Sequence, residues 1–516
     1  MAKKIKKLKK IARSRVLIVG FLILIQFGLI MLAALEFTKY FVVYYSLAYV
    51  IGIIFVLRVI SKKQTMAYKL AWTVVILLFP PFGAAIYTIF CGNHLSEGVL
   101  KLMRAMTGTT LSSVDRKDDV LAQLDTIDRS AEKQSEYIRN TTLCPPYTNC
   151  SAEYFPSGET LIATLERELD KAEKYIFLEY FIIDYGEMWD RIHAVLRRKV
   201  AQGVDVRVIY DDLGSIMTVD KKFNRELESE GIRCRVFHRF SPILTATQNN
   251  RNHRKICVID GRCAFTGGIN IADEYINVKE KHGYWKDNAV MIKGEAAWSF
   301  TVMFLSMWDY LGGVTEKSRV DYSGYKPDYS KYASGHQNGF VQPYTDNPLD
   351  DEPVGENVYL GILASAHDYV WITTPYLIID EQTEQALCKA VKSGVDVRIV
   401  TPGIPDKKFV NETTKSYYPN LIKNGVRIYE YTPGFIHAKT FLCDDKIATV
   451  GSVNLDYRSL YLHFECGVWM YGCDCINEIK SDFEEIFENS SEPKNEKCGI
   501  IRHIWRAILE FLAPLM

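Results

Sequence analysis

Two segments of the sequence repeat one arrangement of side chains that could act on a phosphate ester. In each segment a histidine is followed two residues later by a lysine, then by an aspartate, and then by a glycine-containing turn that ends in an asparagine. The first copy consists of His253, Lys255, Asp260, Gly268 and Asn270. The second copy consists of His437, Lys439, Asp444, Ser452 and Asn454. A single His-x-Lys occurs often by chance, but two copies of the whole pattern indicate a functional site.

The residue types in the two copies suit the transfer of a phosphoryl group. Side chains alternate along a strand, so the histidine and the lysine of each copy point to the same face. The lysine and asparagine groups could hold the non-bridging oxygens of a phosphodiester at the glycine-containing turn and stabilise its transition state. One imidazole could attack phosphorus, while the other protonates the leaving alcohol and then deprotonates the acceptor. This transfer through a phosphohistidine needs neither a metal nor an organic cofactor, because the lysines supply the positive charge.

A further match between the copies supplies one carboxylate for each histidine. The segments WKDNAVMIKG at 285–294 and HFECGVWMYG at 463–472 align without gaps, which places Asp287 opposite Glu465. A carboxylate at this position can hydrogen-bond one imidazole nitrogen and fix the tautomer of the ring. We therefore expect Asp287 and Glu465 to orient the two histidines.

The duplication extends over the region 151–490 and predicts the fold. The segment VAQGVDVRVIYDD at 200–212 matches AVKSGVDVRIVTPG at 390–403, and each contains a helical pattern, a glycine cap and an apolar run. Repeated β-α-β units predict a largely parallel sheet covered by helices. We therefore expect an α/β protein with two duplicated half-domains, 151–325 and 326–490, that share one active site.

The N-terminal region 1–91 has the composition of a membrane region. It contains three stretches without a charged residue, at 16–35, 41–57 and 70–90. A helix of about 20 apolar residues crosses the hydrocarbon core, so these stretches predict about three transmembrane helices in a cell membrane. The basic start of the chain and the basic loop after the second stretch should stay in the cytoplasm, which places the catalytic region outside if the third stretch crosses. The pair Pro80-Pro81 allows a re-entrant hairpin instead, which would keep that region inside.

Two segments lie outside both the repeat and the apolar region. The segment 92–150 is expected to be a polar linker, in which Cys144 and Cys150 could form a disulfide or remain free thiols. The segment 491–516 predicts an amphipathic helix that either lies on an anionic lipid surface or packs on the core. Over the 516 residues the formal net charge is zero, which argues against a dedicated nucleic-acid binder.

Several longer strings resemble those of the phospholipase D superfamily, whose mark is a paired HKD motif, and more closely those of the bacterial cardiolipin synthases. They are RNHRK at 251–255, GGINIADEY at 267–275, TTPYLI at 373–378, HAKTF at 437–441 and GSVNLDYRSL at 451–460. The resemblance implies that two phosphatidylglycerol molecules are joined into cardiolipin with release of glycerol. It also implies that His253 is the nucleophile and His437 the acid and base, a distinction that the residues alone do not make.

Other interpretations stay open at this point. Water as the acceptor would make the protein a membrane phospholipase D that releases phosphatidic acid, and another headgroup could serve as donor or acceptor. A nuclease is disfavoured by the neutral charge and the apolar stretches, and an inactive membrane scaffold by the two complete sets of side chains. The expected partners are phosphatidylglycerol, other anionic phospholipids and the lipid bilayer, and not nucleic acid.

Overall fold

The chain divides into two compact units, which we call the large unit and the N-terminal unit. The large unit comprises Leu95–Arg239 and Asn250–Glu510, and the N-terminal unit comprises Met1–His94, Phe240–Asn249 and Phe511–Met516. The computed structural model describes residues 15–36, 38–62, 65–91, 112–239, 249–313, 321–331, 339–350, 352–493 and 499–515.

The large unit contains two main sheets, one from each copy of the repeat. The strands of the first are β1 (Cys150–Phe155), β2 (Tyr175–Tyr180), β3 (Asp205–Asp211), β4 (Arg233–Phe237), β6 (Ile256–Ile259), β7 (Cys263–Gly267) and β9 (Ala289–Gly294). The strands of the second are β10 (Phe340–Asp346), β11 (Tyr369–Thr373), β13 (Asp396–Pro402), β14 (Arg427–Tyr431), β16 (Thr440–Cys443), β17 (Ile447–Gly451), β19 (His463–Tyr471) and β20 (Ser490–Ser491). A short parallel pair is formed by β12 (Leu377–Ile378) and β18 (Leu455–Asp456).

The two sheets have the same strand order, which confirms the predicted duplication. The first runs β1-β9-β7-β6-β2-β3-β4, and the second runs β10-β19-β17-β16-β11-β13-β14 before it ends in β20. In each sheet the last three strands of the shared order are parallel, whereas the other neighbours are antiparallel. Each sheet is therefore mixed and not largely parallel, because a tight turn joins β6 to β7 and β16 to β17, and such turns make antiparallel pairs.

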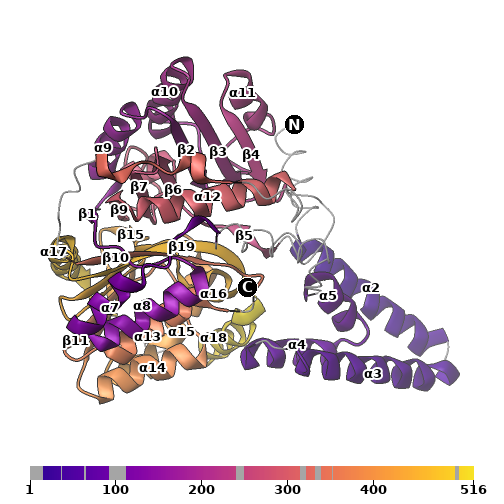
Figure 1. Ribbon diagram of the computed structural model, residues 1–516. Coiled ribbons are helices and arrows are strands. Elements are labelled where there is room, and N and C mark those ends of the chain that lie inside the picture. Colours follow the sequence, from indigo (N-terminus) through magenta and orange to yellow (C-terminus); the bar gives the residue numbers. More distant parts are fainter. Residues whose placement is uncertain are drawn as a thin grey trace. The chain divides into compact units, whose positions relative to one another are not determined.

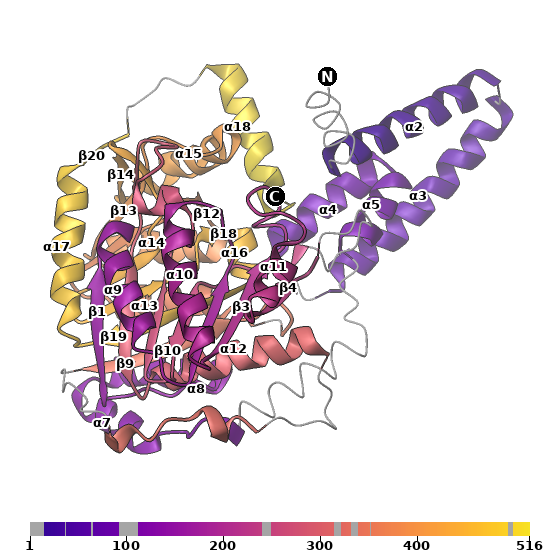
Figure 2. The same ribbon diagram turned by 90° about the horizontal axis from the view of Figure 1, so that it is seen from above.

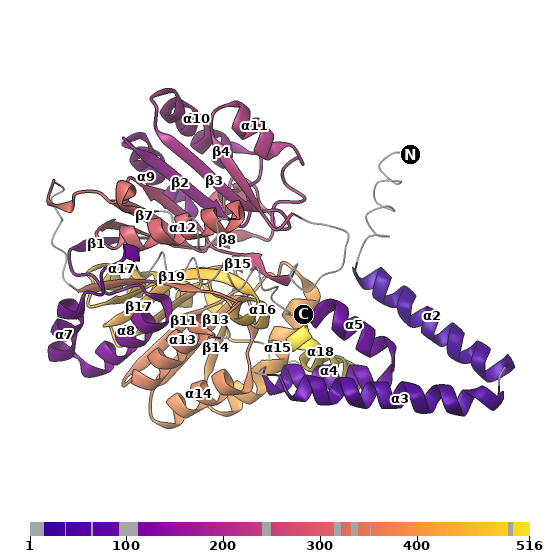
Figure 3. The same cartoon turned by 45° about the vertical axis from the view of Figure 1, so that its right-hand side comes forward.

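Helices cover both faces of each sheet. They are α9 (Gly158–Asp170), α10 (Glu187–Ala201), α11 (Phe223–Ser229) and α12 (Ala297–Gly312) in the first half-domain, and α13 (Val354–Ser365), α14 (Glu381–Lys392), α15 (Lys408–Lys423), α16 (Tyr457–Tyr461) and α17 (Cys475–Glu488) in the second. In Figures 1 and 3, α10 and α11 lie on one face of the first sheet and α12 on the other. Ile176 and Leu178 of β2 pack in the core with α10, whereas Tyr175 and Phe177 pack in the core with α12. That second core continues into the other half-domain, so the two halves fold as one body.

Part of the segment predicted to be a linker packs against the second half-domain. It forms α7 (Asp118–Ile127) and α8 (Arg129–Thr142). Ile138 is buried, and Gln134 Nε2 donates a hydrogen bond of 3.0 Å to the carbonyl oxygen of Gly361 in α13. Cys144 and Cys150 are buried free thiols in this structure.

The N-terminal unit is built from helices α2 (Arg15–Glu36), α3 (Thr38–Ile60), α4 (Met66–Leu78) and α5 (Phe82–Cys91). Figure 2 shows α2 and α3 as a helical hairpin. Among the described residues, one helix, Val42–Ile60, is long and apolar enough to cross a membrane. The predicted third span at 70–90 is not one helix: the chain breaks at Pro80-Pro81, because proline lacks the N–H that a continuous helix requires.

The two helices on either side of that break pack against each other. The rings of Trp72 in α4 and Tyr87 in α5 have centroids 5.3 Å apart, and a Cβ atom at Gly83 would lie 2.6 Å from the Cα atom of Ile76. Gln26 Nε2 of α2 donates a hydrogen bond of 3.1 Å to the carbonyl oxygen of Pro80. The third apolar stretch therefore folds as a helical hairpin within this unit.

The C-terminal segment forms α18 (Ile500–Leu512), with its basic and apolar residues on different sides. Arg502 and Arg506 both donate hydrogen bonds to the carboxylate of Glu412 in α15. Large apolar side chains of the helix are exposed, and they are Ile500, Ile501, Ile504, Trp505 and Ile508. The basic side chains therefore hold the helix on α15, and its apolar side chains are exposed on another side, as the amphipathic pattern predicts.

Candidate active site

Each of the two histidines is held by strands from both half-domains. His253 follows β5 (Arg251–Asn252), which pairs with the start of β19, and its N–H donates to the carbonyl oxygen of Phe464 at 2.9 Å. His437 follows β15 (Gly434–Ile436), which pairs with β8 (Tyr284–Lys286), and its N–H donates to the carbonyl oxygen of Lys286 at 2.6 Å. Figure 1 shows β5 and β15 between the two main sheets. The predicted single site between the halves is therefore formed by reciprocal strand pairing.

Each histidine donates a hydrogen bond to a carboxylate of the other half-domain. His253 of the first half has its Nδ1 2.9 and 3.0 Å from the two carboxylate oxygens of Glu465 of the second half. His437 of the second half has its Nδ1 2.6 Å from Oδ2 of Asp287 of the first half. Both carboxylates are fully buried. Each half-domain therefore orients the histidine of the other, which the alignment of Asp287 with Glu465 does not reveal by itself.

The two carboxylates have different surroundings. Glu465 also accepts hydrogen bonds of 2.5 Å from the hydroxyl groups of Ser452 and Ser459. Asp287 accepts instead from the backbone N–H of Asn288 at 2.9 Å. Ser459 belongs to the string Tyr-Arg-Ser that the first copy lacks. This string therefore makes the two histidine sites unequal, because it adds a hydroxyl donor to only one of the carboxylates.

Lys255 and Lys439 place two further cationic groups beside the histidines. Lys255 Nζ donates to the carbonyl oxygen of His253 at 2.5 Å, and Lys439 Nζ lies 2.8 Å from Nδ1 of His437. Burial lowers the pKa of Lys255 to about 8 and that of Lys439 to about 7. The charge of Lys255 also lowers the pKa of both Lys439 and His437, so the two copies act on one another electrostatically.

The protonation of the site follows from the same environment. Burial lowers the pKa of His253 to about 3 and that of His437 to about 4, so both imidazoles are neutral at pH 7. Burial by itself raises the pKa of Glu465, but contact with His253 and the charge of Lys255 outweigh it and hold that pKa well below its usual range. An ionised carboxylate at Nδ1 keeps the ring proton there and leaves the lone pair of Nε2 free.

Asp260 and Asp444 of the repeated pattern lie at turns and not beside the histidines. The carboxylate of Asp260 accepts from the backbone N–H groups of Glu173, Lys174 and Tyr175 at 2.8–2.9 Å. Asp444 accepts in the same way from the residues 367–369 at 2.7–2.9 Å. The structure therefore shows an anchoring contact for both aspartates, since each carboxylate holds the chain that enters β2 or β11, and their catalytic role stays a prediction.

The residues expected to bind phosphate make internal contacts. Asn270 accepts from the N–H of Ile182 at 3.0 Å and donates to the hydroxyl of Tyr275 at 2.7 Å. Gly268 lies against Asp287, and a Cβ atom on Gly268 would be 2.0 Å from Oδ1 of that residue. Within the described residues, Oδ1 of the buried Asn454 has no hydrogen-bond partner. Of the four residues, Ser452 therefore donates to a carboxylate, that of Glu465, and Gly268 leaves space for the carboxylate of Asp287.

His463 is a third histidine at the site that the sequence pattern did not single out. Its ring centroid lies 5.5 Å from that of His253, and its Nδ1 lies 3.6 Å from Oε1 of Glu465. The signal was present in the alignment of 285–294 with 463–472, which pairs His463 with Trp285. Trp285 packs on His437 at a centroid distance of 5.4 Å. The second copy thus carries an imidazole where the first copy carries an indole.

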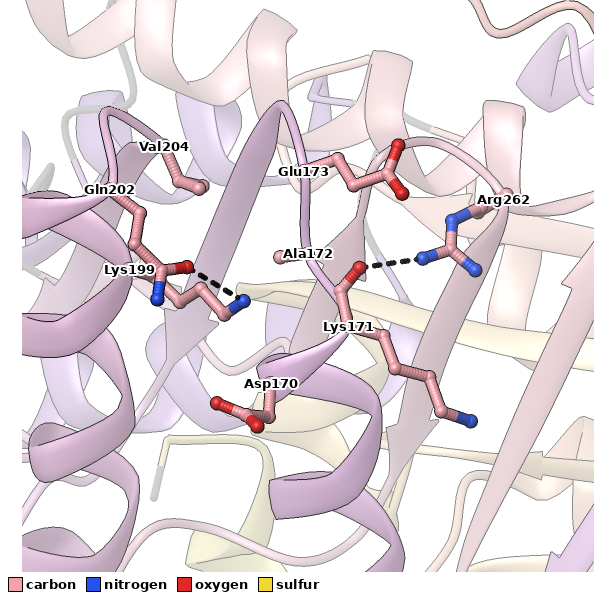
Figure 4. Close-up of a pocket in the computed structure, with 8 residues that line it drawn as sticks. All are labelled: Asp170, Lys171, Ala172, Glu173, Lys199, Gln202, Val204 and Arg262. Atoms are coloured by element: carbon pink, nitrogen blue, oxygen red, sulfur yellow. Dashed lines mark hydrogen bonds between the residues drawn. The ribbon is translucent and has the colours of Figure 1, made fainter.

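A hollow at the far end of the first sheet contains none of these site residues. Figure 4 shows its lining residues, which are Asp170, Lys171, Ala172, Glu173, Lys199, Gln202, Val204 and Arg262. It lies where β2 and β3 begin. The ring of His253 instead lies edge-to-face against Phe181, which follows the last residue of β2, with ring centroids 5.0 Å apart. The chemistry is therefore assigned to the site between the half-domains.

Comparison with known proteins agrees with this geometry. The residues 165–308 and 359–487 match the family described as "Cardiolipin synthase, PLD-like domain", and 47–90 match "Phospholipase_D-nuclease N-terminal". The chain is 32% identical over 473 residues to a cardiolipin synthase of Geobacillus sp. (strain WCH70), with 90% of this chain and 92% of the relative covered. It is 31% identical to cardiolipin synthase 1 of Bacillus anthracis with the same coverage, and 42% identical to an uncharacterized protein of Streptococcus mutans that covers 89% of this chain and 99% of the relative.

A solved structure gives the same fold. The crystal structure of phosphatidylserine synthase from Haemophilus influenzae Rd KW20 superposes with a TM-score of 0.54 at 16% identity, and covers 75% of this chain and 98% of that one. The likeness at this identity concerns the fold alone. Together with the matches over most of the sequence, it shows that the chain belongs to the cardiolipin synthase family with a phospholipase D-like domain.

Proposed function

We propose that the protein transfers a phosphatidyl group from one phosphatidylglycerol to another, forms cardiolipin and releases glycerol. The observation that carries the proposal is the pair of crossed contacts, His253 with Glu465 and His437 with Asp287, beside two buried lysines. The relatives named cardiolipin synthase support this choice of substrate. The donor and the acceptor are then the same lipid, which fits a site with two similar halves.

In the first step, Nε2 of His253 attacks phosphorus, and the bond between phosphorus and the glycerol oxygen breaks. The departing oxygen takes a proton from His437. The anionic phosphodiester raises the pKa of His437 when it binds beside the ring, and thereby favours the protonated imidazole that this step requires. Lys255 and Lys439 stabilise the negative charge that develops on the non-bridging oxygens.

In the second step, the glycerol hydroxyl of another phosphatidylglycerol gives its proton to His437 and attacks the phosphohistidine. Nε2 of His253 leaves, and the ring returns to its neutral form. The hydroxyl groups of Ser452 and Ser459 support the assignment of His253 as nucleophile, because they stabilise Glu465 as the anion that balances the charge of a phosphorylated ring.

For the location, we propose a multi-pass protein of the bacterial plasma membrane that crosses the bilayer with α2 and α3. The helical hairpin of α4 and α5 then enters the bilayer and returns, so that the large unit lies on the cytoplasmic side. Basic residues support this orientation, since eight lysines and arginines precede position 16 in the sequence, Arg58 lies in the last turn of α3, and Lys62 follows that helix. Labelling a thiol introduced at the exposed His367, with a membrane-impermeant reagent on intact cells, tests the side. Labelling before the cells are opened would contradict this orientation.

The function is tested with the purified full chain, phosphatidylglycerol as the lipid, and product analysis by mass spectrometry. We expect cardiolipin with an equal amount of glycerol. Phosphatidic acid as the main product would mean that water is the acceptor, and the protein would then be a phospholipase D. In reactions quenched with a denaturant at mildly alkaline pH, where a phosphohistidine is stable, the wild-type protein should carry a phosphatidyl group and the His253→Ala variant should not.

A further inference from the structure

The imidazole of His463 is the feature of the site for which the proposed reaction has no use. Its side chain is 11% exposed, and within the described residues neither Nδ1 nor Nε2 has a hydrogen-bond partner. A polar group that is buried without a partner costs free energy. The equivalent Trp285 shows that an apolar ring can occupy this position in the fold. A ligand that uses the imidazole would account for a histidine here.

The atoms around His463 have the composition and spacing of a metal site. His253, His463 and Glu465 each offer one ligand atom, and these atoms all lie within 4.8 Å of one another. Two histidines and one glutamate form a known ligand set for zinc, with a fourth position left open. The other histidine, His437, has Asp287 as its carboxylate and the indole of Trp285 as its neighbour, and in the described part of the chain it has no equivalent third ligand.

The surroundings of the three ligands also suit an ion. Metal ligands bind best when further groups hydrogen-bond to them, and Ser452 and Ser459 both donate to the carboxylate of Glu465. A neutral imidazole and an ionised carboxylate are the forms that coordinate a metal.

We propose that His253, His463 and Glu465 bind a divalent ion of the zinc type, and that the bound ion inhibits the enzyme. The ion takes the Nδ1 lone pairs of both histidines and an oxygen of Glu465. The proton of His253 then moves from Nδ1 to Nε2, so the total number of protons on the ring is unchanged. Nε2 no longer has a lone pair for attack on phosphorus, and phosphatidyl transfer stops.

The test measures zinc binding directly on the purified full chain. Wild-type protein is titrated with Zn²⁺ in competition with a chromogenic chelator, and Co²⁺ is used as a spectroscopic probe because tetrahedral Co²⁺ absorbs visible light. We expect one ion per chain, inhibition of cardiolipin formation that a chelator reverses, and no effect of Mg²⁺, which prefers oxygen ligands. The binding measurement does not need turnover, so its failure is distinguishable from a failure of the proposed function.

Two variants make the test specific. His463→Asn should weaken the affinity for Zn²⁺ by at least about tenfold, and should require correspondingly more Zn²⁺ for half-inhibition of its own zinc-free rate. His463→Trp gives the same comparison with the residue that the first copy carries. His193→Asn is the control, since His193 contacts Glu230 at 2.5 Å on the surface of the first half-domain. Absence of bound Zn²⁺ in the wild type, or equal affinity in the His463 variants, would overturn the proposal.

Discussion

The Nδ1 atom of His253 lies 2.9 Å from Oε1 of Glu465, although the two residues are 212 positions apart and belong to different half-domains. The reciprocal contact between His437 and Asp287 also joins residues of different half-domains. Neither half-domain alone therefore contains a histidine with its orienting carboxylate. The duplicated chain has to fold as one body before either imidazole is held in the tautomer that the reaction requires.

The first prediction concerns the charge of Glu465. Glu465→Gln keeps the size of the side chain but removes the anion that holds the proton on Nδ1 of His253. We expect kcat to fall by about 10² to 10⁴-fold, as for other histidines that lose a catalytic partner. The measurement is the initial rate of cardiolipin formation. Glu168→Gln, at a buried carboxylate of α9 bonded to Lys171 and Lys293, is the control and should keep its rate. Equal rates for the two variants would contradict this role of Glu465.

A second prediction separates anchoring from catalysis at Asp260. Asp260→Ala removes an acceptor shared by three backbone N–H groups at the start of β2. Leaving such groups without a partner costs about 1–3 kcal/mol each when they are buried, so we expect a clearly lower melting temperature. The rate per folded molecule should remain close to that of the wild type. Asp170→Ala, at an exposed carboxylate of α9, is the control for thermal stability. A loss of rate without a loss of stability would restore the catalytic role expected from the sequence.

The residues of the site show where prediction from sequence succeeded and where it could not. The His-x-Lys spacing on a strand and the match of Asp287 with Glu465 identified the groups that meet, because both follow from local periodicity and from the duplication. The exchange of carboxylates between halves depends on how β5 pairs with β19 and β8 with β15, and such long-range pairing leaves no local pattern. For Asp260 the sequence predicts a catalytic role and the structure shows contacts at a turn, because position in a motif does not distinguish a reacting carboxylate from one that holds a turn.

The N-terminal region shows a second limit of the sequence argument. Hydropathy found all three apolar stretches, since their length and composition are local properties. The pair Pro80-Pro81 allows a break in the third stretch. Hydropathy does not detect such a break, because it measures only the length and composition of an apolar run and not the backbone N–H that proline lacks. The packing of Trp72 on Tyr87 then decides in favour of a hairpin within the described structure.

A third prediction uses the lowered pKa values of the lysines, about 8 for Lys255 and about 7 for Lys439. The charged lysines bind the phosphodiester, so kcat/KM should fall as pH rises from 7 to 9. The two lysines also make stability depend on pH. Between pH 7 and the ordinary lysine pKa of 10.5, Lys255 and Lys439 bind more protons in the unfolded chain than in the folded chain, so their contribution to the free energy of unfolding rises with pH. Melting temperatures of the wild type and of Lys439→Met at several pH values check this, and the wild type should gain stability relative to the variant as pH rises. A kcat/KM that is constant from pH 7 to 9 would contradict the role of charged lysines in binding.

The last prediction concerns the space beside Asp287. Gly268 and Ser452 occupy equivalent positions in the two copies, yet Ser452 donates a hydrogen bond to Glu465 while Gly268 leaves no room for a side chain. A Cβ atom at 268 would lie 2.0 Å from Oδ1 of Asp287, so Gly268→Ala has to displace this carboxylate from His437. Misplacement of a catalytic group by about 1 Å can cost about 10²-fold in rate, and we expect a loss of this size in kcat with less change in KM. Gly361→Ala on α13 is the matched control, because its Cβ atom would meet Gln134 at an ordinary contact distance of 3.4 Å. If Gly268→Ala formed cardiolipin as fast as Gly361→Ala, the contact between Asp287 and His437 would not limit the reaction.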